Sequence, residues 1–269
     1  MPRGADATGM TDFDAETVRL DVTNDVATLT VDRPDSLNAV NLETLEAIDE
    51  AVGVAAREDA RCLVLTGAGE EAFVAGADVS LMQGLDTPEA HEYCVFGQRV
   101  GRRIEEFPAP TIAAINGYAF GGGMEFALCC DLRVASERAV LGQTELDLGI
   151  IPGWGGTQRL PRLVDDEVAR RLIFFAERVD AQDAQELGIV GEVVAHDELD
   201  DHVRELAEEL AAKPRFALEA AKEALNVRHE TGAEAGLAFE ARAWSGLFGT
   251  HDQREGMQAF VEKRDPEFE

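Results

Sequence analysis

The stretch NGYAFGGGMEFALCCDLRVASERAVLGQTELDLGIIPGWGGTQ, residues 116–158, contains two glutamates that are each surrounded by glycine-rich and apolar sequence. They are Glu125 and Glu145, and no other acidic pair in the chain has such surroundings. A carboxyl group held away from water can exchange protons near neutral pH. The chemistry of this protein is therefore expected around these two residues.

The first part of the stretch, with the residues just before it, predicts a strand, a turn and the start of a buried helix. The run TIAAI, residues 111–115, is apolar and β-rich, and the glycines 121–123 open the apolar segment MEFALCC. The first N–H groups of a helix have no partner within it, and glycine lets a ligand reach them. Partial positive charge gathers at the same end, which suits an oxyanion. Glu125 lies in this first turn.

Each glutamate alone has an ordinary explanation. Glu125 could merely complement the helix dipole, and Glu145 could be a solvated loop residue. The apolar neighbours of Glu125 instead predict a raised pKa, because burial disfavours the charged form. Glu145 precedes the glycine-rich turn IIPGWGG, residues 150–156, which could fold back over the first helix. Together the two residues favour one site built from both.

The segments NGYAFGGGMEFA and GQTELDLGIIPGWGGTQRL resemble the crotonase superfamily, and specifically its enoyl-CoA hydratases. That family signature has a GGG-x-E helix start and a second glutamate in a GQ-x-E-x-x-LG-x-x-PG-x-GG-TQRL run. Residues 72–82, AFVAGADVSLM, and residues 251–264, HDQREGMQAFVEKR, match two further family segments. Several motifs in the right order, over nearly the whole chain after about residue 16, are far more specific than one glycine pattern.

The resemblance implies an α/β fold of the crotonase type, with a ββα spiral core and a C-terminal α-helical oligomerisation region. We expect a flexible acidic arm at residues 1–13, the spiral core with the active site at residues 14–195, and a helical trimerisation region at residues 196–269. The core should open with a β-hairpin, and the chain from Asp165 onward reads as almost all helix. The resemblance also implies a homo-oligomer, either a trimer or a hexamer formed by two trimers.

The resemblance further implies a reaction and roles for its residues. The N–H groups of Ala77 and Gly122 would form an oxyanion hole for the thioester oxygen. Glu125 would be the base that directs water to Cβ, and Glu145 the acid that protonates Cα. The expected activity is reversible hydration of enoyl-CoA thioesters in fatty acid β-oxidation. Superfamily isomerases and hydrolases commonly lack one of the two glutamates, so the pair favours a hydratase over an isomerase or a non-catalytic assembly protein.

The expected substrate is an acyl-CoA thioester, and because coenzyme A is part of it, no separate cofactor is expected. The residues that would contact it are Arg33, Leu37, Ala75, Ala77, Asp78, Val79 and Gly121, with Phe260 and Lys263 from a neighbouring subunit. An ordinary turn explains residues 33–37 equally well, and an N-cap role explains Asp78. Lys263 could be a surface lysine. Trp154, where many relatives carry a small residue, could narrow the acyl channel or pack at the surface.

The charge of the chain is extreme. It has 53 acidic and 24 basic residues, a formal net charge of −29, and its only lysines are Lys213, Lys222 and Lys263. Abundant carboxylates with scarce lysine indicate adaptation to high salt, where self-repulsion is screened. A single acidic docking surface is the weaker alternative, because the acids are spread along the chain. Nucleic acid is not an expected partner, since phosphate binding needs clustered basic residues.

Cysteine and histidine indicate neither a disulfide framework nor a metal site. The cysteines are Cys62, Cys94, Cys129 and Cys130, without a C-x-x-C pair and mostly in apolar runs, which predicts buried reduced thiols. The five histidines lack the spacing of metal ligands. No apolar run is long enough to span a bilayer, and the N-terminus lacks a signal-peptide core. We therefore expect a cytoplasmic protein without membrane contact.

Overall fold

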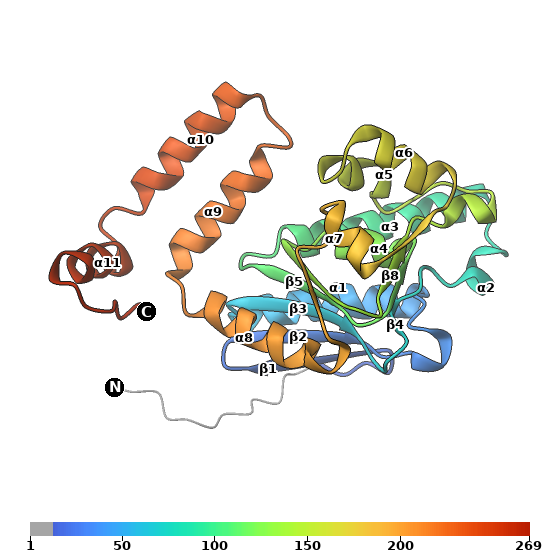
Figure 1. Cartoon of the computed structure of the whole chain (residues 1–269), viewed down its shortest axis with the longest axis horizontal. Helices are drawn as coiled ribbons and strands as arrows, with labels where there is room; N and C mark the ends of the chain where they lie inside the picture. The colour runs from blue at the N-terminus through green and yellow to red at the C-terminus, as the bar shows by residue number, and fades with distance from the viewer. Residues whose placement is uncertain (1–12) are drawn as a thin grey trace.

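The computed structural model describes residues 13–269, which form a body of sheets and helices and a helical arm that extends away from it (Figure 1). Residues 1–12 of the expected N-terminal arm lie outside the described residues.

The larger sheet has six strands in the order β1-β2-β3-β5-β7-β10. β1 and β2 form the expected antiparallel hairpin, and both turn residues, Asn24 and Asp25, have positive φ, as a tight hairpin turn requires. From β2 to β10 all neighbouring strands are parallel. The strands are β1 Val18–Thr23, β2 Val26–Val31, β3 Cys62–Gly67, β5 Thr111–Ile115, β7 Leu132–Ser136 and β10 Glu192–Val194.

The smaller sheet has four short strands in the order β4-β6-β8-β9. They are β4 Ala72–Val74, β6 Tyr118–Phe120, β8 Val140–Gly142 and β9 Arg178–Asp180. Three times in succession the chain passes through a strand of the larger sheet and then one of the smaller sheet, as β3–β4, β5–β6 and β7–β8. These passes stack in chain order in both sheets, so the predicted ββα spiral core is confirmed.

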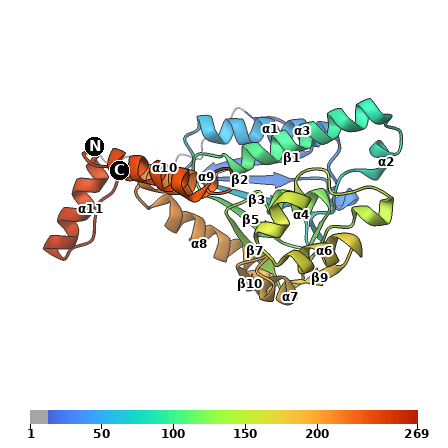
Figure 2. The ribbon, with the colours of Figure 1, turned by 90° about the horizontal axis from the view of Figure 1, so that it is seen from above.

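Helices cover both faces of the larger sheet (Figure 2). α1 Leu42–Arg57 and α3 Thr87–Glu105 lie on one face, and α8 Leu199–Ala211 lies on the other. At the start of α1 the side chain of Asn41 accepts the N–H of Thr44 at 2.8 Å, which caps the helix. The sheet is therefore the middle layer of the body.

One face of α8 is apolar and packs on the larger sheet. Its buried residues are Leu199, Val203, Ala207 and Ala211, at four-residue spacing, and they cluster with Val26, Cys62, Val64, Ile112, Ala114 and Val134 of the strands. Burial of apolar surface contributes about 25 cal/mol per Å², which holds α8 on the body. α8 falls within residues 196–269, and the boundary expected between residues 195 and 196 stays a prediction.

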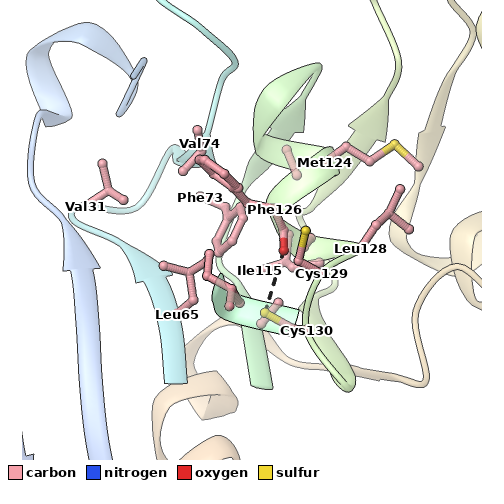
Figure 3. Close-up of a cluster of buried hydrophobic side chains, with 14 of the residues drawn as sticks. Val31, Leu65, Phe73, Val74, Ile115, Met124, Phe126, Leu128, Cys129 and Cys130 are labelled. Carbon is pink, nitrogen blue, oxygen red and sulfur yellow. Dashed lines mark hydrogen bonds between the residues drawn. The ribbon is translucent and has the colours of Figure 1, made fainter. Parts of the chain in front are cut away.

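The short helix α4, Gly122–Ala127, lies inside the main core (Figure 3). All of its residues are buried, and Figure 3 shows Phe126 beside Phe73 and near Ile115. Helix α4 follows β6 directly, so the spiral places its first turn beside the smaller sheet. This turn carries the first of the two glutamates.

Three of the four cysteines are buried free thiols, as predicted: Cys62, Cys129 and Cys130. Burial raises the pKa of Cys62 and of Cys130 to about 12, and it raises the pKa of Cys129 as well. Cys94 is half-buried, and its Sγ donates to the carbonyl oxygen of Gly153 at 3.0 Å. Thiols that stay protonated are poor nucleophiles, so the buried three serve as small apolar residues.

The remaining helices of the body are short. They are α2 Val79–Met82, α5 Gly156–Arg159, α6 Asp166–Phe174 and α7 Ala181–Glu186, with 3₁₀ turns η1 Pro34–Ser36, η2 Glu145–Leu148, η3 Leu160–Arg162 and η4 His196–Glu198. The chain after Asp165 is less helical than expected, because β9 and β10 interrupt it. Each has three residues, too few for an alternating pattern to be visible. None of the helices in the described part of the chain is long and apolar enough to cross a bilayer.

The last three helices run away from the body (Figures 1 and 2). They are α9 Arg215–Val227, α10 Ala233–Gly246 and α11 His251–Glu262. The large exposed apolar side chains of these helices and of the α10–α11 connection are Phe216, Leu225, Leu237, Trp244, Phe248, Met257, Phe260 and Val261. Large apolar side chains exposed in such number are a common feature of surfaces that bind another molecule.

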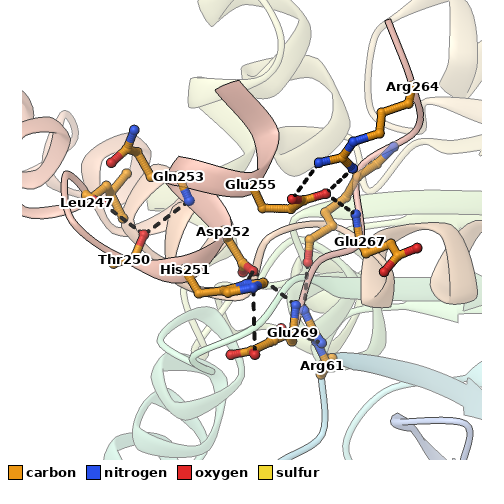
Figure 4. A network of polar contacts seen from close by, with 11 residues as sticks. Arg61, Leu247, Thr250, His251, Asp252, Gln253, Glu255, Arg264, Glu267 and Glu269 are labelled. Atoms are coloured by element: carbon orange, nitrogen blue, oxygen red, sulfur yellow. Dashed lines mark hydrogen bonds and ion pairs between the residues drawn. The ribbon is translucent and has the colours of Figure 1, made fainter. Parts of the chain in front are cut away.

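Polar contacts tie both the base and the tail of this arm to the body. In α9, Lys222 is 7% exposed, and its Nζ pairs with Asp131 at 2.8 Å and donates to the carbonyl of Ala109 at 2.9 Å. At the end of the chain, Arg61 donates to the main-chain carbonyl of Glu269 at 3.2 Å (Figure 4). The base of the arm and its tail are therefore both held against the start of β3 and β5.

Replacing Lys222 with alanine is expected to lower the free energy of unfolding by about 2 kcal/mol, because Asp131 and a main-chain carbonyl lose a buried charged partner. Lys213→Ala is the matched control. Its ammonium pairs with Glu209 on the exposed surface, and its loss should cost less than about 0.5 kcal/mol. Denaturant unfolding measures both variants. Equal losses would contradict this role for Lys222.

Candidate active site

Glu125 lies in the first turn of α4, where the sequence predicts it. The residue before the helix, Gly121, has φ +48° and ψ −121°, a conformation that side chains strongly disfavour. A Cβ on Gly123 would lie 1.9 Å from the carbonyl oxygen of Val74, so glycine is required for β4 to approach the helix. The glycine run thus positions the helix start, and Glu125 with it, at 2% exposure.

The carboxylate of Glu125 is held by main-chain donors from the glycine-rich turn. The N–H groups of Trp154 and Gly156 both donate to its Oε1 at 2.7 Å. Burial raises the pKa of Glu125, while these N–H groups and the charge of Arg159 act in the opposite direction. Both bonds use Oε1, so Oε2 is the oxygen that a ligand can meet.

Glu145 begins the 3₁₀ turn η2 and is 8% exposed. Within the described residues, neither of its carboxyl oxygens has a hydrogen-bond partner. A Cβ on Gly121 would lie 3.2 Å from its Oε1, which places the carboxyl group against the start of α4. Burial, and then the negative charge of Glu125, raise the pKa of Glu145 to about 7. Near neutral pH the group can therefore carry a proton or release it.

The two carboxyl groups differ in a way that suits proton transfer. Glu125 has two donors that favour its ionised form, whereas Glu145 has none and feels the charge of Glu125. A pair with one ionised and one protonated member can remove a proton at one point and supply one at another. The structure brings together the two glutamates that the sequence singled out.

The two N–H groups expected in the oxyanion hole both lie outside the local hydrogen-bond ladders. Ala77 forms an isolated parallel bridge with Val40. The N–H of Val40 donates to the carbonyl of Gly76, and its carbonyl accepts the N–H of Asp78. The N–H of Ala77 therefore points away from Val40. Gly122 is the first residue of α4, where an N–H has no helical acceptor. Their joint role as an oxyanion hole stays a prediction.

The segments expected to contact coenzyme A lie side by side. The N–H of Ala75 donates to the carbonyl of Leu37 at 3.0 Å, and Arg33 pairs with Asp78 at 3.3 Å. The Asp78 carboxylate also accepts the N–H of Ser80, so it caps α2 as the ordinary interpretation predicts. The fold therefore gathers residues 33–37 and 75–79 into one neighbourhood.

Phe260 and Lys263 lie elsewhere. Phe260 is in α11 and Lys263 directly follows it, and α11 and α2 are at opposite ends of the molecule (Figure 1). Phe260 is 85% exposed, and Lys263 ends the helix with a φ of +57°. Within one chain these residues do not join the site. Their supply from a neighbouring subunit stays a prediction.

Three features of the site are fixed only by the structure. Trp154 is 4% exposed, so its ring is buried and does not pack at the surface. Gln143 is fully buried, and neither polar atom of its side chain has a partner among the described residues. Asn38, also fully buried, donates to the carbonyls of Ala68 and Ala72 at 2.9 and 2.7 Å. For both Gln143 and Asn38, the sequence signal that could have indicated a buried amide is a polar residue among apolar or glycine neighbours.

The site has no feature of a metal centre. Within residues 13–269, no three His, Cys, Asp or Glu side chains are grouped so that they could hold a metal ion.

A solved structure of high similarity shares this architecture. The crystal structure of an enoyl-CoA hydratase from Bacillus anthracis matches with a TM-score of 0.90 at 39% identity, covering 94% of this chain and 99% of that one. Fold and site together define an α/β enzyme of the crotonase type.

Sequence comparison narrows the class. The family model for enoyl-CoA hydratase/isomerase matches residues 21–269. A crotonyl-CoA hydratase of Syntrophomonas wolfei is 42% identical over 94% of this chain and 98% of its own length. A short-chain-enoyl-CoA hydratase of Clostridium acetobutylicum is 43% identical over 89% of this chain and 92% of its own length. The chain belongs to the enoyl-CoA hydratase/isomerase family.

Replacing Glu145 with glutamine is expected to stabilise the protein at pH 8.5 more than at pH 5.5. A carboxyl group whose pKa rises from 4.5 unfolded to about 7 folded opposes folding once it ionises, by up to about 3 kcal/mol. The destabilisation by Glu145 is absent below its pKa in the unfolded chain, and it grows as the pH rises toward its pKa in the folded protein. Denaturant unfolding at both pH values measures it.

The matched control for this variant is Glu137→Gln, on the exposed surface, which should change the free energy of unfolding by less than about 0.5 kcal/mol. A gain for Glu145→Gln that is the same at both pH values would show that its carboxyl group is not destabilised by burial.

Proposed function

We propose that this protein is an enoyl-CoA hydratase, which adds water reversibly across the α,β double bond of enoyl-CoA thioesters to give β-hydroxyacyl-CoA. The observation that carries the proposal is a pair of buried carboxyl groups. Burial and the charge of Glu125 raise the pKa of Glu145 to about 7, and neither of its carboxyl oxygens has a hydrogen-bond partner among residues 13–269, whereas Glu125 accepts two main-chain N–H groups. Two such groups are what the reaction requires. One must take a proton from water, and the other must give one to carbon.

The reaction can be assigned to these residues step by step. Glu125 takes a proton from water as the oxygen attacks Cβ, and protonated Glu145 gives a proton to Cα. The electron pair of the double bond passes through the thioester, whose oxygen gains negative charge. The N–H groups of Ala77 and Gly122 are proposed to bind that oxygen, and each such donor lowers the barrier by roughly 3 kcal/mol. In the reverse direction the two glutamates exchange roles.

A short acyl chain is proposed for the substrate. The two relatives at 42% and 43% identity are named for crotonyl-CoA and for short-chain enoyl-CoA. Crotonyl-CoA is therefore the substrate for the first assay, and coenzyme A enters as part of it and not as a cofactor.

Coenzyme A itself is proposed to lie along residues 33–37 and 75–79. Arg33 is the cation of this neighbourhood, and Val79 offers apolar surface at 49% exposure. Lys263 of a neighbouring subunit is proposed to meet a phosphate of the same molecule, with Phe260 beside it. In a chain with three lysines, a lysine at the tip of an arm is suited to this role.

Glu125→Gln and Glu145→Gln are each expected to lower kcat for hydration of crotonyl-CoA by about 10²- to 10⁴-fold, because each removes one of the two proton-transfer groups. Affinity for acyl-CoA should change little, since neither residue lies in the segments proposed to bind coenzyme A. Loss of the ultraviolet absorbance of crotonyl-CoA measures the rate.

Glu137→Gln is again the matched control and should keep the wild-type rate. Near wild-type turnover in either active-site variant would contradict the paired-carboxylate mechanism. If the wild-type protein in high salt gave no hydration, the enzyme would not be a hydratase, and isomerisation of a β,γ-enoyl-CoA would be the next assay.

A homo-oligomer, a trimer or a hexamer of two trimers, is proposed for the functional form. The exposed apolar side chains of α9, α10 and α11 support it, because a second copy of the chain would cover them. The same contact would carry Phe260 and Lys263 to the active site of the neighbour.

Trp244→Asp is expected to dissociate this oligomer, because it places a charge on the exposed apolar face of α10, where Leu237 and Trp244 are both 64% exposed. Light scattering during size-exclusion chromatography measures the mass. Ser245→Asp, one residue along the same helix, adds the same charge away from that face and should leave the mass unchanged. A monomeric wild-type protein would refute the proposal.

A salt-rich cytoplasm and a place in fatty acid β-oxidation are proposed as the setting. The 53 acidic residues against 24 basic ones support the high salt, and they also support the expectation that nucleic acid is not a partner.

A further inference from the structure

The indole of Trp154 occupies a slot that two glycines from different helices leave open. A Cβ on Gly97 of α3 would lie 2.1 Å from the ring nitrogen, and a Cβ on Gly122 of α4 would lie 2.4 Å from the ring carbon Cζ3. The ring stacks on Phe126 with centroids 5.0 Å apart, and it meets Tyr93 edge-on at 5.6 Å. The side chain therefore has one position available to it.

The main chain of the same residue holds the carboxylate of Glu125. Its N–H donates to Oε1 at 2.7 Å, and the second donor, Gly156, follows two residues later. The carbonyl of Trp154 accepts from Nη1 of Arg159 at 2.9 Å, and another nitrogen of that guanidinium pairs with Glu105 at 2.8 Å. Trp154 is thus fixed at its ring, its N–H and its carbonyl.

The turn around Trp154 would be hard to hold in one conformation without that ring. Its neighbours are Gly153, Gly155 and Gly156, and Gly155 has a φ of +120°. Glycine loses more conformational freedom on ordering than any other residue, so a segment with three glycines among four residues resists a single conformation. The indole is the one large side chain of residues 153–156, and it is buried.

We propose that Trp154 is a positioning residue for the hydration reaction: its ring, seated between Gly97 and Gly122, sets the two N–H donors that orient the carboxylate of Glu125. The inference deepens the proposed hydratase function and rests on it. It also gives Gly97 a role, which is to leave room for the ring on a helix where alanine would be the better helix former.

Two effects on catalysis follow if the ring is removed. The turn can relax into the vacated slot, which moves both N–H groups away from Oε1, and hydrogen bonds weaken steeply with distance and angle. Glu125 then loses its orientation toward the attacking water. It also loses the donors that favour its ionised form, so its pKa rises and the active base appears at higher pH.

Trp154→Ala is expected to lower kcat for crotonyl-CoA by about 10- to 100-fold while KM changes less than about 3-fold, because a displaced catalytic group affects the reaction more than binding. In a plot of kcat against pH, the fall of kcat on the acid side should move to higher pH, because the pKa of Glu125 rises. Trp154→Phe keeps an aromatic ring in the slot and should recover most of kcat and the wild-type pH profile. A residue that only stabilised the fold would lower thermal stability and leave the pH profile unchanged.

Gly97→Ala tests the slot independently. In the wild-type protein the added methyl group collides with the ring and should lower kcat about 10-fold or more, whereas in Trp154→Ala the collision partner is gone and the same change should cost nothing further. Gly232→Ala, where a Cβ meets nothing within 4 Å, is the matched control and should be neutral.

The outcomes separate the two levels of inference. Wild-type hydration together with an unchanged kcat and pH profile in Trp154→Ala would overturn the positioning role and leave the hydratase function standing. If the losses of kcat caused by Gly97→Ala and Trp154→Ala were additive in the double variant, the claim that Gly97 leaves room for the ring would be overturned. Absence of hydration by the wild-type protein would overturn both proposals.

Discussion

The close approach of three neighbours to the first turn of α4 is the constraint on which the site depends. Gly121 faces the carboxyl group of Glu145, Gly122 faces the ring of Trp154, and Gly123 faces a main-chain carbonyl of β4. A side chain at any of the three positions would push one neighbour away. The three consecutive glycines therefore allow Glu145, the ring of Trp154 and β4 all to contact the backbone at the start of α4.

This packing explains why two similar carboxyl groups behave differently. Both are buried, and burial raises the pKa of each. One receives two main-chain donors from a turn that is itself anchored, while the other receives none and lies in the field of the first. Difference of environment, and not of residue type, therefore separates the two groups: main-chain donors favour the ionised form of Glu125 against the effect of burial, and the charge of Glu125 favours the protonated form of Glu145. The donors come from a turn some thirty residues beyond Glu125, so the fold is needed to create this difference.

Much of the fold could be predicted from sequence because its long elements have clear periodicity or caps. The hairpin of β1 and β2, the helix that Asn41 begins and the buried strand β3 are of this kind. The smaller sheet was largely missed, because strands of three residues have no readable period, and only the turn of the spiral aligns them. Both glutamates were predictable from their apolar surroundings. Their hydrogen bonds were not, since the donors are main-chain groups that carry no residue-type signal. The location of Trp154 was left open for a related reason: whether an aromatic ring is buried depends on the glycines opposite it, and Gly97 lies almost sixty residues earlier.

The burial of the thiols has a consequence for chemical durability. Electrophiles and peroxides attack the thiolate form of cysteine, and at a pKa of about 12 that form is nearly absent from Cys62 and Cys130 in any cell. Cys94 alone among the four cysteines has partial exposure, and it donates to Gly153, the residue before Trp154. Among the cysteines of this protein, covalent modification should therefore begin at Cys94, one hydrogen bond away from the turn that holds the carboxylate of Glu125.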